Sequence, residues 1–130
     1  MVLRFKFARV SFPRPIAAVV FDMDGVLFDT ETQYEKAALA AAREVGIDMT
    51  SAFFRSTVGS PWPVVRAQIL QEYGAKFDVD RLSEISRRIF HELIAANEIL
   101  KPGVLELLDL LDEFGLPRAV ATSSAQPTVD

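Results

Sequence analysis

The sequence predicts an α/β fold in which a block of helices is inserted into a parallel sheet. Two short apolar segments, residues 16–21 and 118–124, have the composition of strands. The residues between them show helical patterns and contain no convincing strand. Because parallel strands need a long crossover connection, we expect these two strands to pair around a crossover that carries the helical block.

The first predicted strand, residues 16–21, is a continuous apolar run that follows Pro13 and Pro15. A short run without helical periodicity favours a buried strand of a parallel sheet. Residues 1–15 before it contain four basic side chains and no acidic one. They lack the continuous apolar core of a targeting segment, so we interpret them as an N-terminal extension that is frayed or pairs along a sheet edge.

Residues 31–97 form the predicted helical block. It comprises four expected helices, over residues 31–45, 51–57, 61–73 and from Asp80 onward. Ser60 is the expected N-cap of the third helix and Asp80 that of the fourth. Apolar residues recur at helical spacing along the first and fourth helices and should form the core of a small bundle. These inward positions are Tyr34, Ala38, Ala41, Ala42 and Val45, and then Leu82, Ile85, Ile89 and Leu93.

A further helix is predicted over residues 104–114 and ends before Gly115. Its spacing of apolar residues directs Leu105, Leu108 and Leu111 inward. The second predicted strand follows this helix. Residues 16–30 and 98–130 are therefore expected to form a partial α/β core, into which the helical block is inserted.

Composition and charge restrict the function further. Of the 130 residues, 50% are hydrophobic, and the net charge is −4. Outside the basic first 15 residues the chain carries a net charge of −8, which argues against a nucleic-acid partner. No apolar run approaches the ~20 residues that span a bilayer, so we expect no membrane partner. The absence of cysteine excludes disulfides and fits a reducing, cytoplasmic location.

Acidic residues follow the first predicted strand directly. Asp22 and Asp24 stand at its carboxyl end, and Thr122 and Ser123 stand at the carboxyl end of the second strand. In open α/β sheets the ligand site lies at this edge. Two carboxylates in one place repel each other, and Mg²⁺, which typically takes one or two protein carboxylates and substrate phosphate oxygens, removes that repulsion.

This arrangement predicts phosphoryl chemistry. The carboxylate of Asp22 is suited to attack a phosphoryl group as the nucleophile. Asp24 is suited to protonate the leaving oxygen and then to activate water. Gly25 allows the sharp turn that this placement needs, and Thr122 and Ser123 can donate hydrogen bonds to the phosphoryl oxygens.

At these residues the sequence resembles the haloacid dehalogenase superfamily. The matching stretches are "VVFDMDGVLFDTE" and "GLPRAVATSS", and the helical block between them resembles an α-helical cap. The resemblance is to the phosphoglycolate phosphatase and β-phosphoglucomutase-like members. It implies a Rossmann-like core, a Mg²⁺-dependent phosphatase activity through an aspartyl-phosphate, and a small phosphorylated metabolite as substrate. By position, Asp22 resembles the nucleophile and metal ligand, Asp24 the general acid/base and metal ligand, and Thr122 and Ser123 the phosphate-binding residues.

The sequence also departs from the motif pattern of the family that it resembles. The family carries a Lys in a third motif and acids in a fourth, both beyond the second strand, whereas this sequence ends at Asp130. We therefore expect an N-terminal portion of the family's fold that is inactive by itself and self-associates through an uncovered sheet. A β-phosphoglucomutase-type phosphotransferase and a non-catalytic interaction module remain as alternatives. Tyr34 stands where the mutase carries a His, and Trp62 where it carries a cap Arg, and both weaken the mutase alternative.

Overall fold

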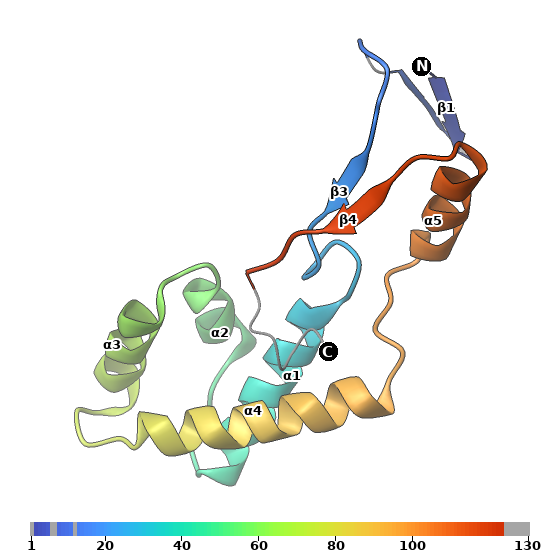
Figure 1. Ribbon diagram of the computed structural model, residues 1–130. Coiled ribbons are helices and arrows are strands. Elements are labelled where there is room, and N and C mark those ends of the chain that lie inside the picture. Colours follow the sequence, from blue (N-terminus) through green and yellow to red (C-terminus); the bar gives the residue numbers. More distant parts are fainter. Residues whose placement is uncertain (1, 6–7, 12, 124–130) are drawn as a thin grey trace. The chain divides into compact units, whose positions relative to one another are not determined.

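The computed structural model describes residues 2–5, 8–11 and 13–123. Its described residues fall into two compact units, one formed by residues 29–99 and one by the residues on either side of that segment. Figure 1 shows the elements in chain order. They are β1 (Val2–Phe5), β2 (Ala8–Ser11), β3 (Val19–Phe21), α1 (Thr30–Glu44), α2 (Ser51–Thr57), α3 (Trp62–Tyr73), α4 (Val79–Ala96), α5 (Val104–Glu113) and β4 (Arg118–Val120).

The sheet of the first unit is short and parallel. β3 pairs with β4 so that Val19 lies opposite Arg118 and Phe21 opposite Val120. The connection between the two strands includes α5, whose residues Val104 and Leu111 pack with Phe21 in a small hydrophobic core. The predicted α/β class is confirmed: this is an incomplete Rossmann-like core with an inserted helical cap.

A hairpin precedes this sheet. β1 and β2 pair antiparallel, with Val2 opposite Ser11 and Phe5 opposite Ala8. The sequence predicts for residues 1–15 an extension that is frayed or pairs along an edge, and not a segment that pairs with itself. Apolar and basic residues alternate over residues 3–7, which is typical of a strand, so the pattern rather than the charge indicates the observed structure.

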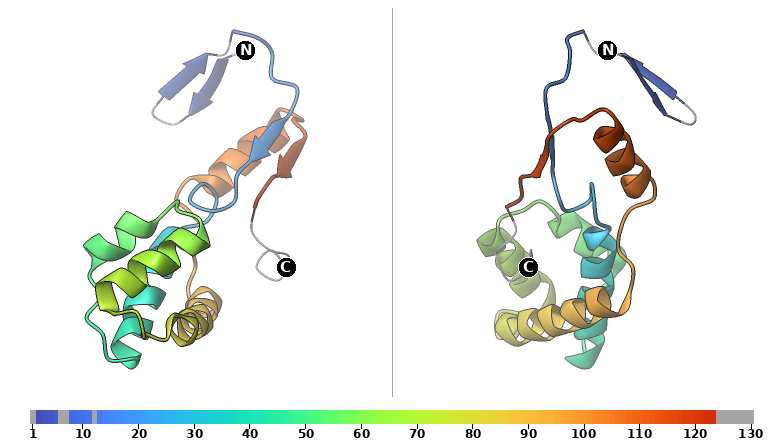
Figure 2. Two further views of the ribbon diagram at one scale, coloured as in Figure 1. Left: turned by 90° about the vertical axis from the view of Figure 1, so that its left-hand side faces the viewer. Right: turned by 45° about the vertical axis from the view of Figure 1, so that its right-hand side comes forward.

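The helical unit is built around the contact of α1 with α4 (Figure 2). Ala37, Ala41 and Ala42 on α1 are completely buried. Small side chains at these positions allow close approach of the two helices. Larger apolar residues from α3 and α4 complete the core of this unit, namely Ile69, Val79, Leu82 and Ile85. The predicted bundle is therefore confirmed, although the buried face of α1 is centred on Ala37 and Ala41, and Tyr34 is 43% exposed.

Two predicted helix starts are wrong. α4 begins at Val79, and its N-cap is Asp78, whose side chain accepts a hydrogen bond from the N–H of Arg81 at 3.0 Å. Asp80 instead pairs with Arg66 on α3, at 2.6 Å between Nη1 and Oδ1. α3 begins at Trp62 after Pro61, one residue later than a Ser60 cap would place it. Asp78 and Asp80 are both of a residue type that caps helix starts, and the ion pair with Arg66 engages Asp80.

The inward face of α5 also differs from the prediction. Leu111 is 1% exposed and Leu108 is partly buried, as expected, but Leu105 is 58% exposed. Val104 takes the buried position. Residues 104, 108 and 111 follow the i, i+4, i+7 spacing of one helix face, and Leu105 lies about 100° away from that face.

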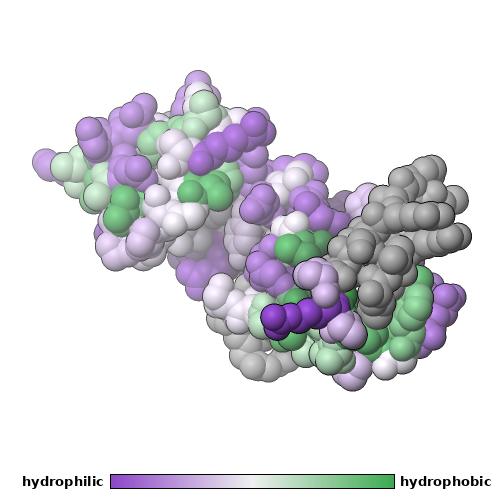
Figure 3. Space-filling model, turned by 90° about the horizontal axis from the view of Figure 1, so that it is seen from above, coloured by the Kyte–Doolittle hydropathy of each residue, from purple (hydrophilic) through white to green (hydrophobic). Residues whose placement is uncertain are grey.

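Hydrophobic residues also reach the surface, among hydrophilic ones, on the face seen in Figure 3. In the sheet unit the exposed ones include Val20, Val120, Leu105 and Phe114. Within the described residues, no helix combines the length and the apolar composition needed to cross a membrane.

Candidate active site

The candidate site begins where β3 ends. Phe21 and Met23 are buried, whereas Asp22 between them is exposed. This alternation follows from the period of two along an extended chain. The carboxylate of Asp22 accepts a hydrogen bond from the N–H of Met23, with 2.7 Å between N and Oδ1. Asp22 is therefore open to solvent at the carboxyl end of the strand, while its neighbours anchor it to the core.

A tight turn follows Asp22. The N–H of Gly25 donates to the carbonyl of Phe28 at 2.8 Å, and the N–H of Leu27 donates to the carbonyl of Met23 at 3.0 Å. Gly25 has φ = 75°, in the left-handed region that glycine occupies without strain. Asp24 lies inside this turn, is partly buried, and its backbone bridges to Phe28. The turn thus fixes the backbone of both acidic residues.

The turn is also held by the segment that leads into α5. The N–H of Lys101 donates to the carbonyl of Leu27 at 2.8 Å, and Phe28 bridges to Leu100. The sequence analysis did not assign a role to these residues. No local signal identifies them, because their contribution is a backbone contact between segments far apart in the chain. Their backbone contacts support the turn.

Thr122 and Ser123 follow β4. The N–H of Ala121 donates to the carbonyl of Phe21 at 2.8 Å and continues the pairing of the two strands by one step. Because β3 and β4 are parallel, the chain leaves both strands at the same edge of the sheet. Thr122 is partly buried and Ser123 is exposed. The structure therefore brings the segments that carry Asp22 and Thr122 to one edge, and the roles of all four residues stay predictions.

The donor set at this edge fits Mg²⁺. Among the described residues, no three side chains of the His, Cys, Asp or Glu types come together as a metal-binding cluster. Mg²⁺ does not require such a cluster, because one or two carboxylates with waters and substrate oxygens complete its shell. The exposed carboxylate of Asp22 and the adjacent Asp24 provide hard oxygen ligands of that kind.

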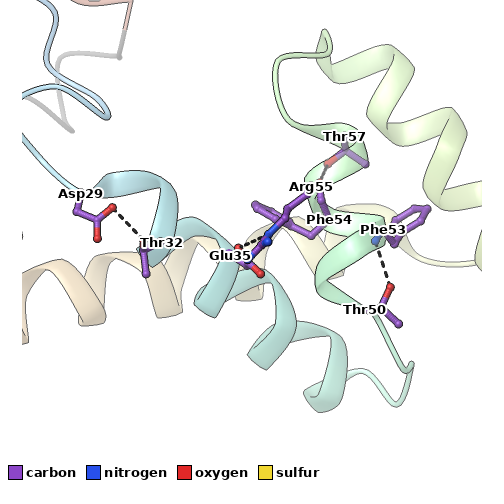
Figure 4. Close-up of polar contacts among 8 residues, drawn as sticks. All are labelled: Asp29, Thr32, Glu35, Thr50, Phe53, Phe54, Arg55 and Thr57. Atoms are coloured by element: carbon purple, nitrogen blue, oxygen red, sulfur yellow. Dashed lines mark hydrogen bonds and ion pairs between the residues drawn. The ribbon is translucent and has the colours of Figure 1, made fainter.

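A second feature, for which the sequence gives no prediction, is an open cavity at the surface of the helical unit. A cavity of about 490 Å³ is lined by residues of α1, α2 and the residue after α2. They include Glu31, Tyr34, Glu35, Phe54, Arg55 and Val58. Figure 4 shows Arg55 extending from α2 toward Glu35 on α1, where Nε and Oε2 are 3.2 Å apart. No sequence pattern announces this cavity, because its lining comes from two separate helices.

Comparison with known proteins identifies relatives. The chain is 34% identical over 113 residues to the phosphorylated carbohydrates phosphatase of Thermotoga maritima, which covers 84% of this chain and 50% of that protein. A structure of CbbY from Rhodobacter sphaeroides in complex with xylulose-(1,5)bisphosphate is 25% identical, with a TM-score of 0.65 over 88% of this chain and 54% of that one. A β-phosphoglucomutase structure from Clostridium difficile is 28% identical, with a TM-score of 0.60 over 85% and 52%.

Two further findings concern the share of its relatives that the chain covers and the family that it matches. The chain spans about half the length of the curated relatives it matches. The model of one family, described as haloacid dehalogenase-like hydrolase, matches residues 16–130, which include β3, the helical unit and β4. The chain therefore belongs to the haloacid dehalogenase-like hydrolases.

Proposed function

We propose that the protein is a Mg²⁺-dependent phosphatase that hydrolyses a small phosphate monoester through an aspartyl-phosphate on Asp22. The observation that carries this proposal is the placement of Asp22, exposed at the carboxyl end of β3 while Phe21 and Met23 on either side are buried. Membership in a hydrolase family with phosphatase-named relatives supports it.

Two steps account for the reaction. A carboxylate oxygen of Asp22 attacks phosphorus, and the bond from phosphorus to the ester oxygen breaks as Asp24 protonates that oxygen. Asp24 then accepts a proton from water, the water oxygen attacks the phosphorus of the aspartyl-phosphate, and inorganic phosphate leaves with Asp22 restored. The hydroxyl of Thr122 and the backbone N–H of Ser123 donate hydrogen bonds to the phosphoryl oxygens in both steps.

Asp22 and Asp24 are the residues that would hold Mg²⁺. When bound, the ion supplies positive charge that offsets the repulsion between two carboxylates and a phosphoryl group. The turn from Met23 to Phe28 fixes the backbone that carries both acids. The protein therefore contributes the placement of the ligands before the substrate arrives.

The second candidate is a phosphotransferase of the mutase type. The 28% identity to a β-phosphoglucomutase favours it. Both candidates use Asp22 in the same first step and differ in what takes the phosphoryl group afterward, water or a second hydroxyl of a sugar phosphate. Measuring inorganic phosphate release alongside sugar-phosphate isomer formation separates them.

For the protein's surroundings we propose a small phosphorylated metabolite as partner and a cytoplasmic location. The absence of cysteine supports that location, and the acidic charge outside the first 15 residues supports the absence of a nucleic-acid partner. We also propose that the 130-residue chain alone is inactive as a phosphatase, with a non-catalytic interaction module as the alternative. The chain spans about half the length of its relatives, which supports this proposal.

The assay uses the natural protein that contains this chain. Phosphate release from a generic phosphomonoester is measured with Mg²⁺, with a chelator, and after Asp22→Asn. We expect both the chelator and the substitution to lower the rate by about a hundredfold or more. Asp109→Asn, an exposed acid on α5, is the matched control and should keep full activity. Retention of more than a tenth of the rate by Asp22→Asn would exclude Asp22 as the nucleophile.

A further inference from the structure

The hairpin of β1 and β2 has two chemically different faces. The two strands pair antiparallel with each other, and in the described part of the chain neither pairs with β3 or β4 (Figure 2). Residues directly opposite each other in such a pair share a face, and the faces alternate along each strand. The register therefore places four apolar residues on one face, namely Leu3, Phe5, Ala8 and Val10. The other face carries Val2, Arg4, Arg9 and Ser11.

The register also sets two like charges against each other. Arg4 lies directly opposite Arg9. Like charges in this position destabilise a strand pair, and a hairpin of two strands is by itself only marginally stable in water. Residues 1–15 contain four basic residues and no acidic one that could offset the repulsion. Because an anion bound at this face would remove the repulsion, the pairing favours an anionic partner.

We propose that this hairpin binds the surface of a membrane that contains anionic lipids. Amphipathic segments lie in the bilayer interface with the apolar face about 5–10 Å deep, at the boundary of headgroups and acyl chains. A single β-layer is about 10 Å thick, the distance at which sheets stack. With the apolar face toward the acyl chains, the face that carries Arg4 and Arg9 therefore lies at the level of the phosphate groups.

This mode of binding needs no membrane span. The expectation of no membrane partner rests on the lack of a ~20-residue apolar run, and a segment that lies on the surface does not require one. The cytoplasmic face of membranes carries anionic lipids that attract clusters of basic residues. The proposal concerns the hairpin alone, goes beyond the phosphatase function and does not depend on it.

Two other classes of partner fit the hairpin less well. A single nucleic-acid strand stacks its bases on aromatic residues in the same groove that holds its phosphates, whereas Phe5 and Arg4 belong to opposite faces. An acidic protein surface, such as that of a second copy of this chain, covers the basic face and leaves the apolar face in water. A bilayer interface accommodates both faces at once.

The test measures binding of the full chain to two kinds of vesicle. One is made of phosphatidylcholine alone, and the other is an equimolar mixture of phosphatidylcholine and phosphatidylserine. The bound fraction is measured by co-sedimentation, without any phosphate ester. At about 0.1 M salt we expect at least about tenfold tighter binding to the anionic vesicles. This preference should largely disappear at about 1 M salt, where the Debye length falls from about 10 Å to about 3 Å.

Paired substitutions assign the preference to the hairpin. Arg4→Gln with Arg9→Gln should weaken binding to the anionic vesicles by about tenfold or more. These changes also relieve the repulsion across the strand pair, so a loss of binding does not arise from unfolding of the hairpin. Arg81→Gln with Arg87→Gln removes the same charge from exposed positions of α4 and should keep the affinity.

A fluorescent reporter tests the apolar face separately. The chain contains a single tryptophan, Trp62, which lies on α3. In the variant with Phe5→Trp and Trp62→Phe, we expect the emission maximum to move to shorter wavelengths when anionic vesicles are added, because the indole ring leaves water. The wild-type chain reports on Trp62 and should show no such shift.

Three results would overturn the proposal. They are equal or absent binding to the two kinds of vesicle, full affinity in the variant of Arg4 and Arg9, and unchanged emission in the Phe5→Trp variant. Tighter binding to a single-stranded oligonucleotide than to anionic vesicles would instead identify a nucleic acid as the partner. Self-association that depends on the two arginines, without vesicle binding, would identify a second copy. Since no arm of this test involves phosphoryl transfer, its failure and the failure of the phosphatase assay are independent.

Discussion

Arg55 on α2 lies 3.2 Å from the carboxylate of Glu35 on α1, measured from Nε to Oε2, and joins two helices of the cap. The side chain of Arg55 is 71% exposed and that of Glu35 is 20% exposed. Solvent therefore weakens this pair. Hydrogen bonding by Ser51 and then by Arg55 nevertheless lowers the pKa of Glu35 below its ordinary value.

The lowered pKa of Glu35 predicts how stability changes with pH. A carboxyl whose pKa is lower in the folded than in the unfolded chain stabilises the fold above its unfolded pKa. That contribution is lost as the pH falls through the folded-state pKa, below the ordinary value of 4.5. We therefore expect Glu35→Gln to destabilise the helical unit at pH 7, and we expect the difference from wild type to shrink on acidification below about pH 4.5.

Urea unfolding midpoints, measured at pH 7 and at steps toward pH 3, check this prediction. Glu84→Gln on α4 is the control, because this exposed acid has no described side-chain partner. A destabilisation by Glu35→Gln that stays constant over the whole pH range would contradict the ionic origin of the effect.

The contact of α1 with α4 predicts a strong response to added volume. Ala41 has no exposed surface, so Ala41→Leu forces extra methyl groups into a close helix contact and should destabilise the unit by about 1–3 kcal/mol. Ala95→Leu makes the same change at an exposed position of α4 and should be nearly neutral. Chemical denaturation of both variants measures the difference, and similar midpoints for the two would show that α1 and α4 do not pack closely at Ala41.

Much of the fold follows from local patterns in the sequence. The predicted helix over residues 51–57 has the same bounds as α2, and the side chain of Thr50 caps its start by accepting a hydrogen bond from the N–H of Phe53. The strand ending at Phe21 was also placed correctly at its carboxyl end, although β3 begins at Val19 rather than at residue 16. Strands shorten where no partner continues the ladder, and β4 offers only three residues for pairing.

The parts that escaped prediction depend on contacts between distant residues. Asp78 and Asp80 are equally suited to cap α4, and the position of Arg66 on another helix decides which one remains available. The cavity likewise requires Tyr34 to stack on Phe90 and Arg55 to meet Glu35. At the candidate active site, the sequence places Asp22 at the end of a strand, but it does not reveal the backbone support from Lys101.

Exposed apolar residues of the short sheet predict self-association. Val20 and Val120 are 65% and 52% exposed, and they lie on opposite faces because Val20 pairs with Ala119 and Val120 with Phe21. Apolar strand surfaces of this kind tend to pair with other chains. We expect the 130-residue chain to associate with itself in a concentration-dependent way, and we expect Val20→Thr with Val120→Thr to shift it toward the monomer. Thr keeps the branched shape that favours strands.

Sedimentation or light scattering over a range of concentrations measures this association. Val64→Thr, the same change at an exposed position of α3, is the control for a general effect of removing surface valine. A strictly monomeric wild-type chain at all concentrations would rule out association through the sheet.

Turnover by the 130-residue chain alone is expected to be slow. Asp24 carries a proton when it acts as the acid, so Asp22 brings one negative charge to the edge of the sheet and a phosphoryl dianion brings two more. A single Mg²⁺ leaves a net charge of about −1, so the attacking carboxylate still meets a net repulsion. The resemblance to the wider family implies a further Lys and further acids beyond the second strand, and the absence of one preorganised electrostatic group typically costs about 10²–10³ in rate. We therefore expect the chain alone to release phosphate at least about a hundredfold more slowly than a full-length relative such as the Thermotoga maritima phosphatase.

Both proteins are assayed with the same phosphomonoester and Mg²⁺, and the Asp22→Asn variant of this chain gives its background rate. A rate within tenfold of the relative that disappears in Asp22→Asn would show that the loops after β3 and β4 suffice for catalysis.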